Sequence, residues 1–224
     1  MKFTFNLNKK ESNMNKIKMF SLTACFAFAL ASAQPSISIS GSAGYYRAVV
    51  DGLEDYPFNG FSFQAGLSGL IPMTDIAGFG IGAYVGYSSV SATDEDDVEL
   101  ALSGLYLGLE PKLRLGQEKT YADISLQIAI PLSNKATMKV PGYGSMDLPV
   151  EDAETSFAVG FFGRYNVIGA GIAKTLNGSN GATILAASIL IPLSEQFEMG
   201  PSISYAMGKD ETDLIISLGF ECTF

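Results

Sequence analysis

Two short runs of carboxylates are the residues of this sequence best suited to bind a metal ion. Carboxylate oxygens are hard ligands of the kind that Ca²⁺ and Mg²⁺ prefer. Runs of like charge in loops more often only solvate the chain, so a cation site and a solvated loop are both open here. The candidate ligands are Asp94, Glu95, Asp96, Asp97, Asp210 and Glu211.

A second set of charged residues carries both signs and alternates with apolar residues. Glu110, Lys112 and Arg114 are each separated by one residue, so a strand would place all three on one face. Opposite charges on the same face of neighbouring strands can pair, and unpaired charges in a closed interior are costly. The alternative for Glu198 is solvation at a rim. The predicted cluster consists of Glu110, Lys112, Arg114, Asp123, Arg164 and Glu198.

The 224 residues include no histidine. Triads that use histidine as the base, and metal sites that use it as a ligand, are therefore excluded. No glycine-rich phosphate-binding loop is present either. We therefore expect neither an enzyme nor a bound cofactor. A hydrolase that uses only carboxylates is the remaining catalytic alternative, although no motif indicates one.

The first 33 residues have the pattern of a secretory signal peptide. Several lysines precede an apolar segment, residues 19–33, that ends in the small residues ASA. This order predicts cleavage before Gln34, and the segment is shorter than a membrane-spanning helix requires. Both Met1 and Met14 are possible start sites. Removing the segment leaves 9 basic and 22 acidic residues, a net charge of −13, so nucleic acid is not an expected partner.

Residues 34–224 show the alternation of apolar and polar residues that is typical of β-strands. In the segment SISISGSAGYY, for example, the serines lie on one face and the isoleucines on the other. Turn signals such as NGSNG separate about ten such strands, with eight as the alternative. A change of parity near Ser103 and Gly104 predicts a β-bulge. The sequence therefore predicts one all-β domain, a closed antiparallel up-and-down barrel.

The composition of the polar face indicates that this face is the interior. It consists mainly of Ser, Gly and Ala, whereas about 25–35% of a soluble surface is charged. Small uncharged residues suit a narrow lumen, and the apolar face would then contact lipid. The mixed-sign charges fall toward the strand ends nearest the amino terminus, so we expect an ion-pair cluster that partly closes the lumen there. Aromatic residues predict the two membrane interfaces, with Tyr45, Phe61, Tyr87 and Phe157 at one and Phe79, Tyr165, Phe197 and Phe224 at the other.

The signal peptide, the alternating strands and the closing segment LIISLGFECTF together resemble a known family. The family is that of small outer-membrane β-barrels related to the transmembrane domain of outer-membrane protein A and to opacity-type proteins. The resemblance implies insertion into the outer membrane of a Gram-negative bacterium by the barrel-assembly machinery. It also implies that Phe220 and Phe224 belong to the assembly signal. The implied partners are outer-membrane lipids and lipopolysaccharide, and we expect a monomer.

Two functional classes follow from these features. The first is an integral outer-membrane barrel with a structural, adhesive or narrow-pore role. The second is a soluble, secreted, lipocalin-like barrel that holds an apolar ligand against an inward-facing apolar surface. In the first class, the long connection over residues 132–153 is the best place for a binding surface, because function in rigid barrels tends to lie on loops.

Overall fold

The computed structural model describes residues 35–51, 55–117, 119–150, 154–177, 181–209 and 211–224. The predicted signal peptide, residues 1–33, and its cleavage site before Gln34 lie outside these residues, as does Asp210. Within the described residues no helix is long and apolar enough to cross a membrane.

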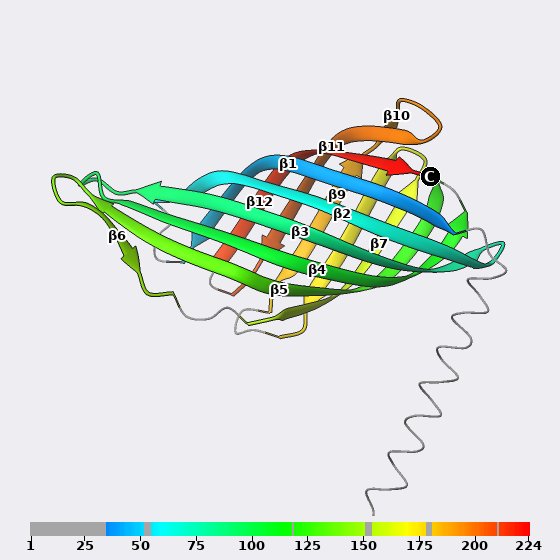
Figure 1. Ribbon diagram of the computed structural model, residues 1–224, viewed down its shortest axis with the longest axis horizontal. Helices are drawn as coiled ribbons and strands as arrows, with labels where there is room; N and C mark the ends of the chain where they lie inside the picture. Colours follow the sequence, from blue (N-terminus) through cyan, green and yellow to red (C-terminus); the bar gives the residue numbers. More distant parts are fainter. Residues whose placement is uncertain (1–34, 52–54, 118, 151–153, 178–180, 210) are drawn as a thin grey trace, which may run out of the picture.

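Ten strands form a closed antiparallel barrel, which confirms the predicted fold class and strand number (Figure 1). Consecutive barrel strands pair with each other, β12 pairs with β1, and β9 pairs with β11 to complete the ring. The barrel strands are β1 (Ser36–Val50), β2 (Phe58–Thr74), β3 (Ala77–Thr93), β4 (Glu99–Gln117), β5 (Thr120–Val140), β7 (Ser156–Tyr165), β8 (Ile168–Thr175), β9 (Thr183–Ile189), β11 (Phe197–Met207) and β12 (Glu211–Thr223).

Two short strands complete the described structure. β6 (Gly144–Leu148) pairs with β5 beyond the barrel. β10 (Ile191–Pro192) pairs with β11 in the same register as β9 does, so it continues β9 after an interruption. The interruption, at Leu190, lies opposite Gly200 of β11, next to Pro201, which has no backbone N–H to donate to the ladder.

The two ends of the barrel differ in their connections. At one end, here called the turn end, β2–β3, β4–β5 and β7–β8 are joined by two-residue turns. The opposite end, here called the loop end, carries the longer and more acidic connections. β1 begins at the turn end, and the chain's last residue, Phe224, lies there too, hydrogen-bonded in both directions to Ile37. Short and long connections therefore alternate along the chain because they lie at opposite ends of the barrel.

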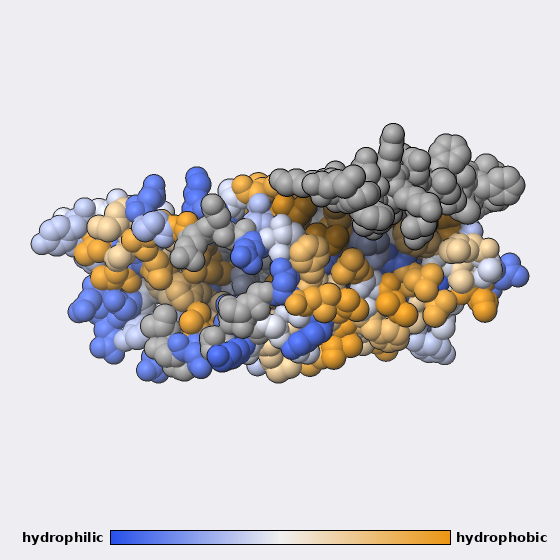
Figure 2. Space-filling view, turned by 90° about the horizontal axis from the view of Figure 1, so that it is seen from below, coloured by the Kyte–Doolittle hydropathy of each residue, from blue (hydrophilic) through white to orange (hydrophobic). Residues whose placement is uncertain are grey.

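Large apolar side chains cover the outside of the barrel and form a hydrophobic belt. Phe61 and Leu67 of β2 and Leu218 of β12 are each more than half exposed to the surroundings. In Figure 2 hydrophobic residues gather along one half of the molecule, and hydrophilic residues are more frequent toward the other end. A soluble barrel would bury such residues, so the lipocalin-like alternative is wrong. Its expected inward-facing apolar surface is the outer surface of this barrel.

A bulge is present next to Ser103 and Gly104, as predicted, but it lies in the β4–β5 ladder and its additional residue is on β5. β3 and β4 pair without a break from Thr93–Glu99 to Ala77–Leu115. The register shift lies between β4 and β5 at Leu105/Tyr106, opposite an additional residue, Leu132, on β5. The change of parity in β4 has a different cause. Its residues keep pointing to the same two sides, but beyond Gly104 the outer side no longer belongs to the hydrophobic belt.

Beyond that point β3, β4 and β5 continue out of the barrel and, with β6, form a protruding sheet (Figure 1). It comprises residues 88–93, 99–104, 133–140 and 144–148, and at its base residues 88–91 still pair with β2 of the barrel. The expectation of one long loop over residues 132–153 is therefore wrong for most of that segment. Alternation through Ala136, Met138 and Val140 keeps β5 in the sheet, and a turn with Gly142 and Gly144 at positive φ returns the chain as β6.

Candidate functional site

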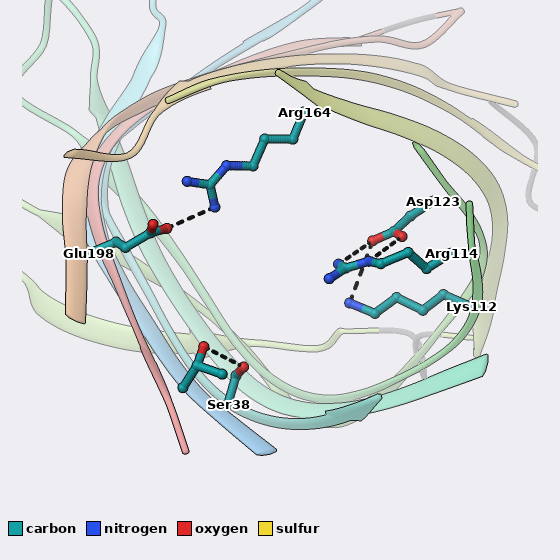
Figure 3. Close-up of polar contacts among 7 residues, drawn as sticks. Ser38, Lys112, Arg114, Asp123, Arg164 and Glu198 are labelled. Carbon is teal, nitrogen blue, oxygen red and sulfur yellow. Dashed lines mark hydrogen bonds and ion pairs between the residues drawn. The ribbon is translucent and has the colours of Figure 1, made fainter. Parts of the chain in front are cut away.

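The lumen near the turn end holds an ion pair between adjacent strands (Figure 3). Arg114 of β4 lies directly opposite Asp123 of β5. Its Nε donates a 2.8 Å hydrogen bond to Asp123 Oδ1, and one terminal nitrogen donates a 2.8 Å hydrogen bond to Asp123 Oδ2. Lys112 approaches the same carboxylate at 3.8 Å. The Arg114 guanidinium also lies 3.5 Å from the centre of the Tyr121 ring. Asp123 is buried, so this fork is shielded from bulk water.

A second ion pair joins two strands that are not neighbours, along the inner surface of the barrel. Arg164 of β7 reaches past β8 and β9 to Glu198 of β11, with a nitrogen–oxygen distance of 2.7 Å. Lys119 also contacts Glu198, at 3.3 Å, and Arg164 Nε donates a 2.6 Å hydrogen bond to the Asn166 carbonyl. The remaining terminal nitrogen of Arg164 is buried without a hydrogen-bond partner among the described protein atoms. Glu198 is therefore a paired residue of the lumen, and solvation at a rim does not describe it.

Five of the six predicted cluster residues thus form two groups on opposite sides of the lumen (Figure 3). One group contains Lys112, Arg114 and Asp123, and the other contains Arg164 and Glu198. Glu110 lies higher on the luminal face and takes part in none of the ion pairs between described residues. Alternation places these residues on one face but does not determine their partners.

Two tyrosines fill the middle of the lumen, and sequence reasoning missed them. Tyr84 of β3 and Tyr106 of β4 pack edge to face with ring centres 6.1 Å apart. Each ring lies over the glycine opposite it in the ladder: Tyr106 over Gly86, and Tyr84 over Gly108. A Cβ atom at either glycine would overlap the ring. The reciprocal spacing Tyr-x-Gly in both strands is the sequence signal that could have revealed this packing.

Apolar side chains occupy the luminal face at the loop end. Phe58, Val90 and Ala136 come from three different strands, and each is less than 9% exposed. They stand above the tyrosines, so charged, aromatic and apolar layers follow one another along the lumen. Their positions on the otherwise polar face of β2, β3 and β5 were not singled out from the sequence.

Asp213 is a half-buried acid at the loop end. It pairs with Ala48, three residues beyond Tyr45 of the predicted aromatic interface, and so lies outside the hydrophobic belt. Burial and the neighbouring Glu211 raise the pKa of Asp213 to about 6, against a smaller lowering by the Tyr46 hydroxyl. The raised value means that this carboxyl group gains a proton in mildly acidic solution.

The carboxylates proposed as cation ligands form a turn. Asp94 Oδ1 accepts hydrogen bonds from the backbone N–H groups of Asp96 and Val98, and Asp97 has a φ of 60°. An aspartate at position 94 is therefore explained by its role in forming the turn, without a metal ion. Among the described residues no group of three or more side chains is arranged to hold a metal ion. Glu95 is exposed, Glu211 lies opposite Val50 at the start of β12, and Asp210 lies outside the described residues.

The two residues assigned to the assembly signal lie at the seam that closes the barrel. Phe220 pairs with Gly41 of β1, and its ring stacks on Phe197 with ring centres 6.1 Å apart. Phe224 donates a 2.8 Å hydrogen bond to the Ile37 carbonyl and is 65% exposed at the turn end. Both face outward, where membrane-interface residues are expected, and their recognition by the assembly machinery stays a prediction.

The comparisons with known proteins agree on the fold. No known protein family and no curated protein matches the sequence. The β-domain of the Bordetella autotransporter BrkA is 12% identical, with a TM-score of 0.52, and the match covers 85% of this chain and 100% of that one. The COG4313 outer-membrane channel from Pseudomonas putida F1 is 10% identical, with a TM-score of 0.52 over 86% and 96% of the two chains. Ail, the attachment invasion locus protein of Yersinia pestis, has a TM-score of 0.47 at 14% identity over 85% and 99%. The first two show that this chain has the fold of outer-membrane β-barrels.

Proposed function

We propose that this protein is a non-catalytic outer-membrane barrel that holds a protruding sheet at the cell surface, with a structural or adhesive role. The observation that carries the proposal is the reversal of polarity along β3, β4 and β5. Inside the ring these strands present apolar residues outward, and beyond it they present polar residues outward. A protein that crosses a membrane and then enters water has this requirement. The turn end then faces the periplasm, and the loop end faces the outside of a Gram-negative cell.

The filled lumen argues against the narrow-pore alternative. The Arg114–Asp123 fork and the Arg164–Glu198 pair occupy opposite sides of the lumen near the turn end, and the Tyr84 ring lies above them. A ten-stranded ring is narrow enough for side chains to fill. Purified protein in planar lipid bilayers should show no steady conductance steps above those of the lipid alone. Regular ion-conducting steps would overturn this part of the proposal.

Basic residues on the outer face support contact with the anionic head groups of lipopolysaccharide. Arg47 and Lys135 occupy outward-facing positions of β1 and β5 beyond the aromatic residues of the loop end on those strands or their neighbours. Positive side chains at that level suit phosphate groups at the membrane surface. Divalent-cation bridging through the acidic loops has no such geometric support. Insertion by the barrel-assembly machinery and a monomeric state complete the proposal.

Cell fractionation tests the proposal directly. The protein should be recovered from the outer membrane only with detergent. Unboiled samples should migrate differently from boiled ones on denaturing gels, because closed barrels resist unfolding by the gel detergent. Recovery of folded protein from the periplasm without detergent would overturn the proposed location.

A further inference from the structure

The protruding sheet has one apolar face and one polar face. Directly paired residues of an antiparallel ladder lie on the same side of the sheet. The pairs Val90–Leu102, Leu102–Ala136 and Ala136–Leu148 therefore form one apolar row, and Leu100–Met138 and Met138–Met146 form the next. The opposite face consists of Ser89, Ser91, Glu99, Ala101, Ser103, Lys135, Thr137, Lys139, Ser145 and Asp147.

The apolar face is the continuation of the luminal face, and among the described residues only its base is buried. Val90 and Ala136, next to the barrel mouth, are buried. Farther out, Leu102 is 39% exposed and Met146 is 48% exposed. These outer residues lie beyond the ring, so membrane lipid does not cover them. A strand face of this composition is normally packed against another element.

Charge around this face indicates what kind of partner fits it. The turn that joins β3 and β4 at its tip carries Asp94, Glu95, Asp96 and Asp97, and Asp213 lies on the inner face across the barrel mouth. The two lysines of the protruding sheet lie on the polar face, where Glu99 and Asp147 balance their charge. Lys135 and Lys139 are paired with Ser103 and Glu99 on the polar face. The apolar face therefore lies in a negative field, which favours a positive ligand.

We propose that the apolar face of the protruding sheet is a docking surface for a cationic, apolar-rich segment of another polypeptide. The apolar side chains of that segment pack on Leu102, Met138 and Met146, and its basic residues approach the acidic turn. The two facing methionines suit a variable partner, because their flexible side chains adapt to different shapes. The inference rests on the proposed function, since only that orientation presents the sheet to the outside.

A fluorescent peptide of repeating leucine and lysine is the probe. Its binding to the full protein in neutral phosphatidylcholine nanodiscs is measured by fluorescence anisotropy, with empty nanodiscs as the reference. The wild-type protein should bind it above that reference, and a matched leucine–glutamate peptide should not bind. Binding should weaken as salt rises, and Glu95→Gln with Asp96→Asn should weaken it at low salt.

Matched substitutions on the two faces separate docking from general stickiness. Met146→Gln and Leu102→Gln should each raise the Kd about fivefold, because each removes roughly half of a full side-chain burial from the complex. Ser103→Gln and Thr137→Gln on the polar face should leave it unchanged. The heat-dependent gel mobility of every variant shows whether the barrel has folded.

Several results would overturn the proposal. They are equal binding of the leucine–glutamate peptide, equal effects of both faces, or no binding above empty nanodiscs. In the last case, destabilisation by Met146→Gln would assign the face to the chain's own loops, and concentration-dependent self-association would assign it to a second copy. Fractionation is independent of all these readouts, so a protein that is found in the outer membrane but does not bind the peptide refutes the docking surface alone.

Discussion

Replacing Asp123 by asparagine should destabilise the barrel more than any exposed charge replacement. The substitution keeps the shape of the side chain but removes the only carboxylate within ion-pair distance of both Lys112 and Arg114 among the described residues. These cations are only 16% and 20% exposed, and Asp123 is 7% exposed. Removing one partner of such a buried pair costs about 3–5 kcal/mol, because the remaining charge stays desolvated.

Urea unfolding of protein in lipid vesicles measures this loss. With a slope of about 2 kcal/mol/M, a loss of about 3 kcal/mol lowers the midpoint by roughly 1.5 M. Far-ultraviolet circular dichroism is a suitable signal, since the chain contains no tryptophan. The control is Glu99→Gln, which removes the exposed 4.0 Å pair with Lys139 and should cost less than about 1 kcal/mol. If Asp123→Asn costs no more than Glu99→Gln, the reasoning about a shielded luminal ion pair is wrong.

Three further predictions concern other parts of the barrel. Gly86→Ala should cost about 1–3 kcal/mol in the same assay, since its Cβ would overlap the Tyr106 ring, whereas Gly82→Ala should be mild because its nearest neighbours are 3.6 Å away. Equal costs would contradict the packing. Stability should fall as pH rises from about 4 through 6, because folding raises the pKa of Asp213 from 3.8 to about 6 and the folded state therefore binds more protons in that range. Asp213→Asn should remove this loss of stability between pH 4 and 6. A variant with the same pH profile as the wild type would refute the role of Asp213. Deleting Phe224 should lower the outer-membrane yield, and a normal yield would argue against its role in assembly.

Alternation determined most of the fold from the sequence because it is strong in every barrel strand. Within the ring most serines and glycines of β1 to β3 have the parity of the luminal face, and Lys112, Arg114, Asp123, Arg164 and Glu198 share it. Which charges pair was not predictable, because Arg164 reaches Glu198 over two strands and strand parity contains no distance across the lumen.

The protruding sheet shows where the pattern was misread. Leu100 and Leu102 have the parity of luminal residues, and apolar residues at that parity suggested a bulge. In the structure the strand is regular, and its surroundings change from lipid to water. Methionines and glycines over residues 138–146 likewise suggested a loop, although β5 and β6 pair there in register. Periodicity predicts which residues share a face of a strand. Whether that face contacts lipid, water or the lumen has to be inferred separately.

Nitroxide accessibility along the outer face tests the central claim most directly. In a Cys222→Ser background, single labels are placed at Leu67 and Ile203 in the hydrophobic belt and at Thr137 on the outer face of the protruding sheet. The account predicts that oxygen, which concentrates in lipid, relaxes the first two labels more strongly, and that a water-soluble nickel complex relaxes the third. Strong relaxation of the labels at Leu67 and Ile203 by the nickel complex would contradict a barrel that crosses the membrane.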